Sequence, residues 1–349
     1  MKIRCLMIEL MIIIGLLLTS TLMAKQNSSS VSSLPKAAEG QVTRTLSNIS
    51  NWSYWMNYNG MSGIDPQGNS GGIYPRGTAG AIFQDGFIWG GKYPKDGGTK
   101  EIRVGGQTYN IGTTPGWIQS DGTPVSQSDP RVRIYRIRPD YKTLTHAMVV
   151  QEAAEANMVD ASAVTENMTQ AIIDQYATDW NEWPADLGAP FVDIDGDGVY
   201  NPEVDKAGIA NADQVVWFVC HDFDRTNALG LYGSEPIGIE LQVTAWAYNQ
   251  PGARLGQIIF KKYKMINKSG KDIEEMYVAQ WCDPDLGEAS DDLLGCDTTL
   301  SMGYVYNGQD ADNKYAAFGL APAAVGYDFF QGPLVDGVAG QDINRNGID

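Results

Sequence analysis

The residues best suited to carry chemistry lie between Asp193 and Asp205, where the sequence is DIDGDGVYNPEVD. Carboxylates at the first, third and fifth positions, with glycine at the sixth, form an oxygen-lined turn of the kind that binds Ca²⁺. The pattern departs from an EF-hand loop, because Val204 stands at position 12 and no helical periodicity precedes Asp193. We therefore predict an EF-hand-like calcium loop without EF-hand helices; the alternative is a solvated acidic turn. The predicted ligands are Asp193, Asp195, Asp197, Asn201, Glu203 and Asp205.

A second acidic segment covers residues 283–297 and follows an apolar run. So many carboxylates in a short loop repel one another unless cations or water relieve the repulsion. Three alternatives stay open: a second, weaker Ca²⁺ site, a pair of catalytic carboxylates in a glycosidase, or a solvated loop. The acidic residues concerned are Asp283, Asp285, Glu288, Asp291, Asp292 and Asp297.

Cys282 and Cys296 bracket this acidic loop. An exported protein meets oxidising conditions, so a disulfide between them could close the loop and leave Cys220 as a buried thiol. The alternative is three unpaired thiols. A third acidic run, at residues 342–349, resembles the start of another calcium loop and indicates that the chain is a fragment of a longer protein.

Two weaker patterns each have a functional and a structural interpretation. The sequence His221-Asp222-Phe223-Asp224 could hold a metal or a general base, or could simply be the polar end of a strand. Three neighbouring aromatic residues could stack on a sugar, or could lie in an ordinary sandwich strand, which is the interpretation we favour. These are Trp52, Tyr54 and Trp55.

The period of the apolar residues predicts a mainly β fold, sandwich-like and with tight hairpins, interrupted by a helical insert over about 143–183. We expect hairpin turns at residues 84–86, 105–106 and 267–271, and a strand over 131–138 with one face in water. The expected helix carries an apolar stripe formed by Met168, Ile172, Tyr176, Trp180 and Trp183. The predicted regions are β-rich 44–140, helical 141–187, calcium-loop 188–213, β-sandwich 214–306 and loop-rich 307–349.

The start of the chain indicates where the protein is located. Residues 1–24 combine a basic beginning, an apolar run and a small-residue end, which is the layout of a cleaved signal peptide, and residues 25–43 read as a flexible linker. No later segment is apolar enough to predict a membrane span in the mature chain. The net charge of −17 argues against binding to nucleic acid, because both molecules would be negative. We expect a secreted or outer-surface protein whose partner is an extracellular protein or polysaccharide.

Several segments together resemble the N-terminal half of large secreted or cell-surface proteins from bacteria that use type IX secretion. That family is functionally uncharacterised, so the resemblance implies export and a longer parent protein but no catalytic residues. We favour a calcium-stabilised structural or binding protein that is not an enzyme. The alternative is a carbohydrate-active enzyme or carbohydrate-binding module that uses loop 283–297. The segments that carry the resemblance are GIYPRG (72–77), FIWGG (87–91), DWNEWPADLGAP (179–190), ADQVVWFV (212–219), INKS (266–269) and the runs 193–205, 231–233, 236–240 and 281–297.

Overall fold

The computed structural model describes residues 41–109 and 112–332, so the expected leader, most of the linker and the acidic run at 342–349 lie outside the described residues. Strands dominate, which confirms the predicted mainly β fold. The strands are β1 (Arg44–Ser47), β2 (Ser53–Asn57), β3 (Gly72–Ile73), β4 (Gly80–Ile82), β5 (Gln84–Pro94), β6 (Lys100–Gly106), β7 (Thr114–Pro115), β8 (Tyr135–Ile137), β9 (Phe191–Val192), β10 (Lys206–Ala207), β11 (Gln214–His221), β12 (Ile239–Ala247), β13 (Phe260–Asn267), β14 (Glu274–Asp283), β15 (Asp292–Asp297), β16 (Met302–Asn307) and β17 (Ala324–Asp328). The α-helices are α2 (His146–Asn157), α3 (Glu166–Asn181), α4 (Arg225–Tyr232) and α5 (Asn313–Ala316).

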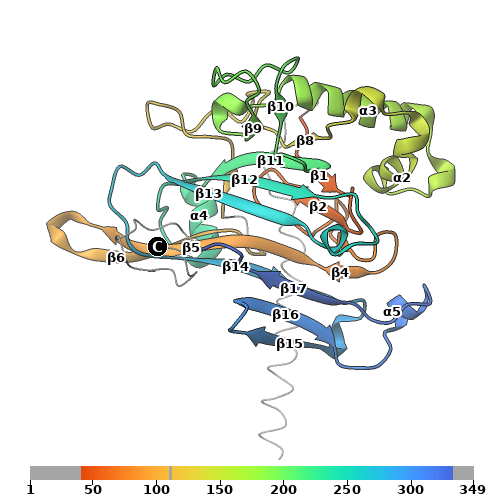
Figure 1. Ribbon diagram of the computed structural model, residues 1–349. Coiled ribbons are helices and arrows are strands. Elements are labelled where there is room, and N and C mark those ends of the chain that lie inside the picture. The colour runs from red at the N-terminus through yellow and green to blue at the C-terminus, as the bar shows by residue number, and fades with distance from the viewer. Residues whose placement is uncertain (1–40, 110–111, 333–349) are drawn as a thin grey trace, which may run out of the picture.

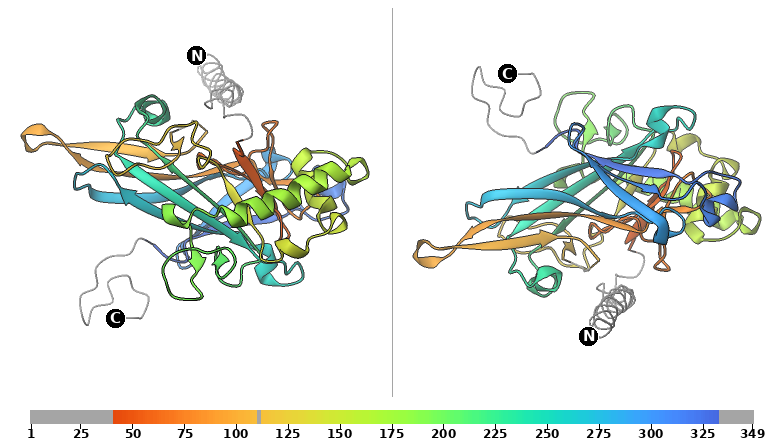
Figure 2. Two further views of the ribbon diagram at one scale, coloured as in Figure 1. Left: turned by 90° about the horizontal axis from the view of Figure 1, so that it is seen from above. Right: turned by 90° about the horizontal axis from the view of Figure 1, so that it is seen from below.

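The elements are stacked in layers (Figure 1). Helices α2 and α3 lie over the sheet with strand order β13-β12-β11-β7, in which β8 also pairs with β11. The three-stranded sheet β14-β5-β6 lies on the other side of that sheet, and the sheet β15-β16-β17 lies beyond it. Figure 2 shows the hairpin of β5 and β6 extending past the neighbouring strands. None of the helices in the described part of the chain has the length and apolar character needed to cross a membrane.

The central strand β11 is covered on both faces, which explains its unbroken apolar sequence. All eight of its residues are buried. Val216 and Phe218 point into a core between the two main sheets, whereas Val215 and Trp217 point into a second core under the helices. Strand β12 alternates in the same way, with Leu241 and its alternate neighbours in the first core. The fold is thus a sheet-on-sheet packing with a helical layer on one outer face.

The helical layer matches the predicted insert and its apolar stripe. Thr165 is the N-cap of α3, and its side chain accepts a hydrogen bond from the backbone N–H of Met168. Of the stripe residues, Met168 is partly buried against the second core, and the other four are buried in it. The stripe is therefore core packing, spaced to face one side of the helix.

The prediction of a strand over 131–138 with one face in water is wrong: residues 132–138 are buried, and only Tyr135–Ile137 form a strand, β8. Arg136 forms an ion pair with Glu152 of α2, with 2.8 Å between Nη2 and Oε1, and both side chains are about 5% exposed. Arg133 forms an ion pair with Asp179 of α3, which also accepts the backbone N–H of Arg136 at 2.8 Å. The arginines reach into the helical layer instead of solvent, because carboxylates on the buried sides of α2 and α3 neutralise them.

The turn predicted at residues 84–86 is wrong, because these residues begin the long strand β5. Asp85 is buried there and accepts hydrogen bonds from the hydroxyls of Tyr54 and Tyr327, while its ion pair with Lys261 measures 2.9 Å. The chain reverses instead between β5 and β6, where the N–H of Lys95 donates to the carbonyl of Thr99. Gly105 and Gly106, also predicted as a turn, end β6.

The hairpin predicted around residues 267–271 does not form as a pair of bonded strands. Strand β13 pairs with β12, whereas β14 pairs with β5 in the opposite sheet, so the chain crosses from one sheet to the other at this connection. The predicted regions 44–140 and 214–306 share both of these sheets and one core. The loop-rich region also contributes a strand, β17, which pairs with β16.

Candidate metal centre

The segment between Asp193 and Asp205 forms the loop of a small hairpin, flanked by the antiparallel strands β9 and β10. Strands stand on both sides of the loop, in place of the helices of an EF-hand. Two hydrogen bonds fix the loop to α3: the hydroxyl of Tyr200 donates to the carbonyl of Trp180 at 2.7 Å, and the indole of Trp180 donates to the carbonyl of Pro202 at 3.2 Å. The loop is thus held rigidly against the helical layer.

Three carboxylates converge at the exposed end of this loop. Asp193, Asp195 and Asp197 each offer an oxygen, and the three oxygens lie within 4.8 Å of one another. Gly196 and Gly198 both have φ near +77°, a conformation that allows the sharp reversal bringing alternate residues to one side. This group of three aspartates could hold a metal ion, and among the described residues it is the one cluster of metal-ligating side chains with that property.

The electrostatics of the loop reflect this crowding. The backbone N–H of Gly198, and then that of Gly196, hold the pKa of Asp193 below its usual value. The pKa of Asp195 is raised, first by loss of hydration and then by repulsion from the carboxylates of Asp197, Asp205 and Asp193. A divalent cation placed among these oxygens would convert that repulsion into attraction.

The other three predicted ligands have different positions. Asp205 is buried and closes the loop, because its two oxygens accept the N–H groups of Ile194 and Asn201, both at 2.8 Å. Glu203 points outward and pairs with Lys142 at 3.3 Å. The side chain of Asn201 caps a turn by accepting the N–H of Glu203 at 3.1 Å. Glu203 and Asp205 do not belong to the cluster of carboxylate oxygens that could hold a metal ion.

The second acidic segment, residues 283–297, is not brought together as one site in the described part of the chain. Asp283 ends β14 and accepts the hydroxyl of Tyr109, whereas Asp297 ends β15 and caps the next turn through the N–H of Thr299 at 2.9 Å. Asp291 accepts the side-chain amide of Asn307 at 3.2 Å. Strand β15 places Asp297 at its far end from Asp292, whereas Asp283 and Asp292 stay close enough to Asp285 to repel its charge. Glu288, also predicted here, is exposed.

Within this segment, the surroundings of Asp285 disfavour the ionised form of its carboxyl group. Burial, and then the carboxylates of Asp283 and Asp292, raise its pKa to about 6. The folded protein therefore binds this proton more tightly than the unfolded chain, whose aspartate pKa is about 3.9. The resulting stabilisation is complete below about pH 4 and is lost as the pH rises through 6.

We expect Asp285→Asn to raise the free energy of unfolding at pH 7.5 by about 1 kcal/mol, since asparagine is neutral and solvent screens part of the effect. At pH 4 the variant and the parent should be equally stable. Urea unfolding at both pH values measures this, with the exposed Asp272→Asn as the control. If Asp285→Asn is no more stable than the parent at pH 7.5, the ionised carboxylate of Asp285 does not destabilise the folded state.

The possible disulfide between Cys282 and Cys296 is not formed. Both residues, like the buried Cys220, are free thiols. Cys282 lies on β14, opposite Asp85 of β5, whereas Cys296 lies on β15, opposite Gly303 of β16. The two cysteines belong to strands of different sheets, and no disulfide closes the loop between them.

The residues of the two weaker patterns lie at strand ends, at a helix cap and in the core. His221 ends β11 in a buried position, where its Nδ1 accepts the N–H of Phe223 at 3.1 Å, and burial lowers its pKa to about 4. Asp222 accepts three backbone N–H groups at the entry to β12, and Asp224 caps α4. The aromatic residues proposed as a sugar platform are buried around β2, as favoured from the sequence; they are Trp52, Tyr54 and Trp55.

Comparison of the chain with family models, curated proteins and solved structures finds no match.

Proposed function

We propose that this chain is a secreted or cell-surface β protein that binds Ca²⁺ in the loop 193–205 and serves as a non-enzymatic structural or binding module. The observation that carries the proposal is the convergence of Asp193, Asp195 and Asp197. An all-oxygen set of ligands in an exposed turn suits Ca²⁺ better than Zn²⁺, which prefers nitrogen and sulfur. The signal-peptide pattern at residues 1–24 and the resemblance to exported proteins support the location.

The position of the loop supports a stabilising role for the ion. The loop is attached to Trp180 of α3 and is closed from inside by Asp205, so an ion bound at its exposed end would tie β9 and β10 to the helical layer. Extracellular calcium modules bind with dissociation constants of about 10⁻⁴–10⁻³ M. At about 1 mM Ca²⁺ such affinity stabilises the folded state by roughly 0.4–1.4 kcal/mol.

Calcium is therefore expected to raise the melting temperature by about 1–4 °C, without being required for folding. Calorimetric titration and thermal melts in chelator and in about 1 mM CaCl₂ measure this. Asp195→Ala should lose the calcium-dependent shift, and in chelator it should melt no lower than the parent, because it removes one of the repelling carboxylates. Asp96→Ala, at an exposed aspartate in the β5–β6 turn, is the matched control and should keep the full shift.

A melt that is identical in chelator and in calcium, with no heat of binding, would show the loop to be only a solvated acidic turn. A full calcium shift in Asp195→Ala would place the ion elsewhere. The alternative, a carbohydrate-active enzyme or carbohydrate-binding module that uses loop 283–297, has less support, because the aromatic residues around β2 are buried.

A further inference from the structure

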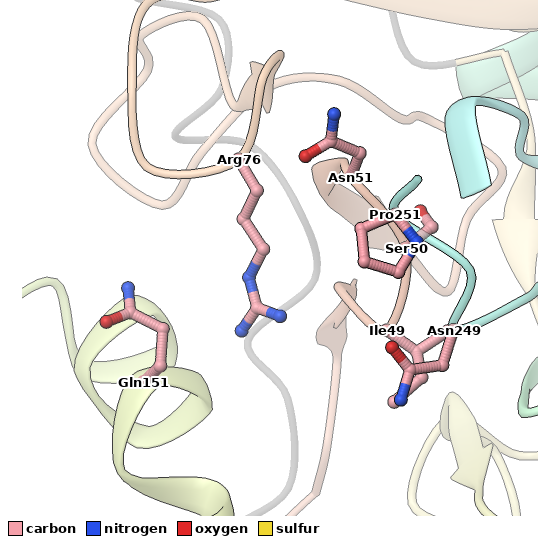
Figure 3. Close-up of a pocket in the computed structure, with 7 residues that line it drawn as sticks. All are labelled: Ile49, Ser50, Asn51, Arg76, Gln151, Asn249 and Pro251. Carbon is pink, nitrogen blue, oxygen red and sulfur yellow. The ribbon is translucent and has the colours of Figure 1, made fainter. Parts of the chain in front are cut away.

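An open cavity of about 310 Å³, lined by both polar and apolar residues, lies beside α2. Its wall comes from four separate segments: residues 49–51 between β1 and β2, Arg76 between β3 and β4, Gln151 on α2, and Asn249 with Pro251 after β12. Figure 3 shows Arg76 and Gln151 on one side, with Asn249 and Pro251 opposite. The volume is at the lower end of the range for small-molecule sites, about 300–1,000 Å³.

The charge in this wall is neutralised within the protein. Arg76 forms a two-point ion pair with Glu155, with Nε–Oε1 at 2.6 Å and Nη2–Oε2 at 2.9 Å. This pair also fixes the guanidinium, because both side chains are held in one orientation. The cavity therefore presents no uncompensated charge from Arg76, and a charged ligand would find no counter-ion among the residues that line it.

The wall offers donors and acceptors that have no partner among the described residues. Asn51 donates through Nδ2 to Gln257 at 2.9 Å, which leaves its Oδ1 as an acceptor. Gln151 donates through Nε2 to Glu155 at 3.3 Å, which leaves its Oε1 as an acceptor. The side-chain amide of Asn249 makes no hydrogen bond with the described residues and can donate as well as accept.

Ile49 and Pro251 add an apolar surface next to these amides. A sugar ring has the same mixture: hydroxyls that each donate and accept, and C–H faces that pack on apolar side chains. We infer that this cavity binds a neutral sugar residue, through the amides of Asn51, Gln151 and Asn249 and the guanidinium of Arg76. This inference is independent of the calcium proposal, because the cavity shares no residue with loop 193–205.

The test is saturation-transfer NMR on the full chain in constant calcium, with the methyl α-glycosides of glucose, galactose and mannose, and with sodium glucuronate as the anionic probe. We expect at least one neutral glycoside to bind with a dissociation constant in the millimolar range. Asn249→Ala should weaken that binding about tenfold, because it removes a donor and an acceptor. The side chain of Asn249 is exposed and makes no hydrogen bond with the described residues, so the melting temperature of this variant should stay unchanged.

Gln250→Ala is the matched control, since Gln250 is the exposed neighbour of Asn249 but does not line the cavity. It should bind the glycosides as the parent does. The inference is overturned if no neutral glycoside binds, if glucuronate binds and the neutral glycosides do not, or if Asn249→Ala binds with the affinity of the parent. The variant Asp195→Ala distinguishes the two proposals. It should lose the calcium-dependent rise in melting temperature and should bind the neutral glycoside with the affinity of the parent.

Discussion

Asp85→Ala is expected to lower the free energy of unfolding by about 3–5 kcal/mol, the range found when one partner of a buried ion pair is removed. Lys261 would keep a buried charge without its counter-ion, and the hydroxyls of Tyr54 and Tyr327 would lose their acceptor. Burial, followed by the Asp85 charge, already raises the pKa of both tyrosines well above 10. Urea unfolding at pH 7.5 measures the effect.

The double variant Asp85→Asn with Lys261→Met distinguishes the charge from the packing. It removes both charges together, so it should be clearly more stable than Asp85→Asn alone. Asp272→Ala, at an exposed aspartate, should change stability by less than about 0.5 kcal/mol. A loss of under 1 kcal/mol in Asp85→Ala would mean that the buried pair contributes little to the fold.

The second large effect is expected for Glu152→Ala, which should also cost about 3–5 kcal/mol. Glu152 faces Arg136 at 2.8 Å and Arg138 at 3.6 Å, and it accepts the hydroxyl of Tyr176 at 2.6 Å. Its removal leaves Arg136 without its ion-pair partner beneath α2, whereas Arg138 keeps Asp140 at 2.8 Å. Urea unfolding followed by circular dichroism reports the helices together with the sheets.

The control for this variant lies on the neighbouring helix. Asp174→Ala removes an exposed carboxylate of α3 and should be nearly neutral. Glu152→Gln, which keeps an acceptor for Tyr176 but loses the charge, should fall between the parent and Glu152→Ala. If Glu152→Gln matches the parent, hydrogen bonding and not charge is what the helical layer requires.

The elements with a strong local signal could be predicted from the sequence. The stripe of α3 repeats at helical spacing, and the glycine-punctuated aspartates at 193–198 specify a turn by themselves. Both features depend on neighbours within a few residues, so no knowledge of the rest of the chain was needed.

The buried charges and the strand pairing could not be predicted, because they depend on distant partners. Asp85 sits next to Gly86, which is a turn signal, and only its contacts with Lys261 and Tyr327 show that it belongs inside a strand. One available signal was missed: Glu152 and Asp179 lie on the apolar sides of helices, where a carboxylate implies a cationic partner. The arginines of residues 133–138 are those partners.

The pairing of β5 with β14 also determines the order in which the protein can fold. Gln280 and Gly86 are bonded across this pair but lie 194 residues apart in the sequence. At about 5–20 residues per second, a ribosome needs roughly 10–40 s to make the chain between them. During that time the longest strand has no β14 to pair with, and a loop this large is slow to close. Strand β5 can pair with β6 as soon as both are made, but its other edge stays unpaired until β14 is synthesised, and an unpaired strand edge exposes the growing chain to aggregation.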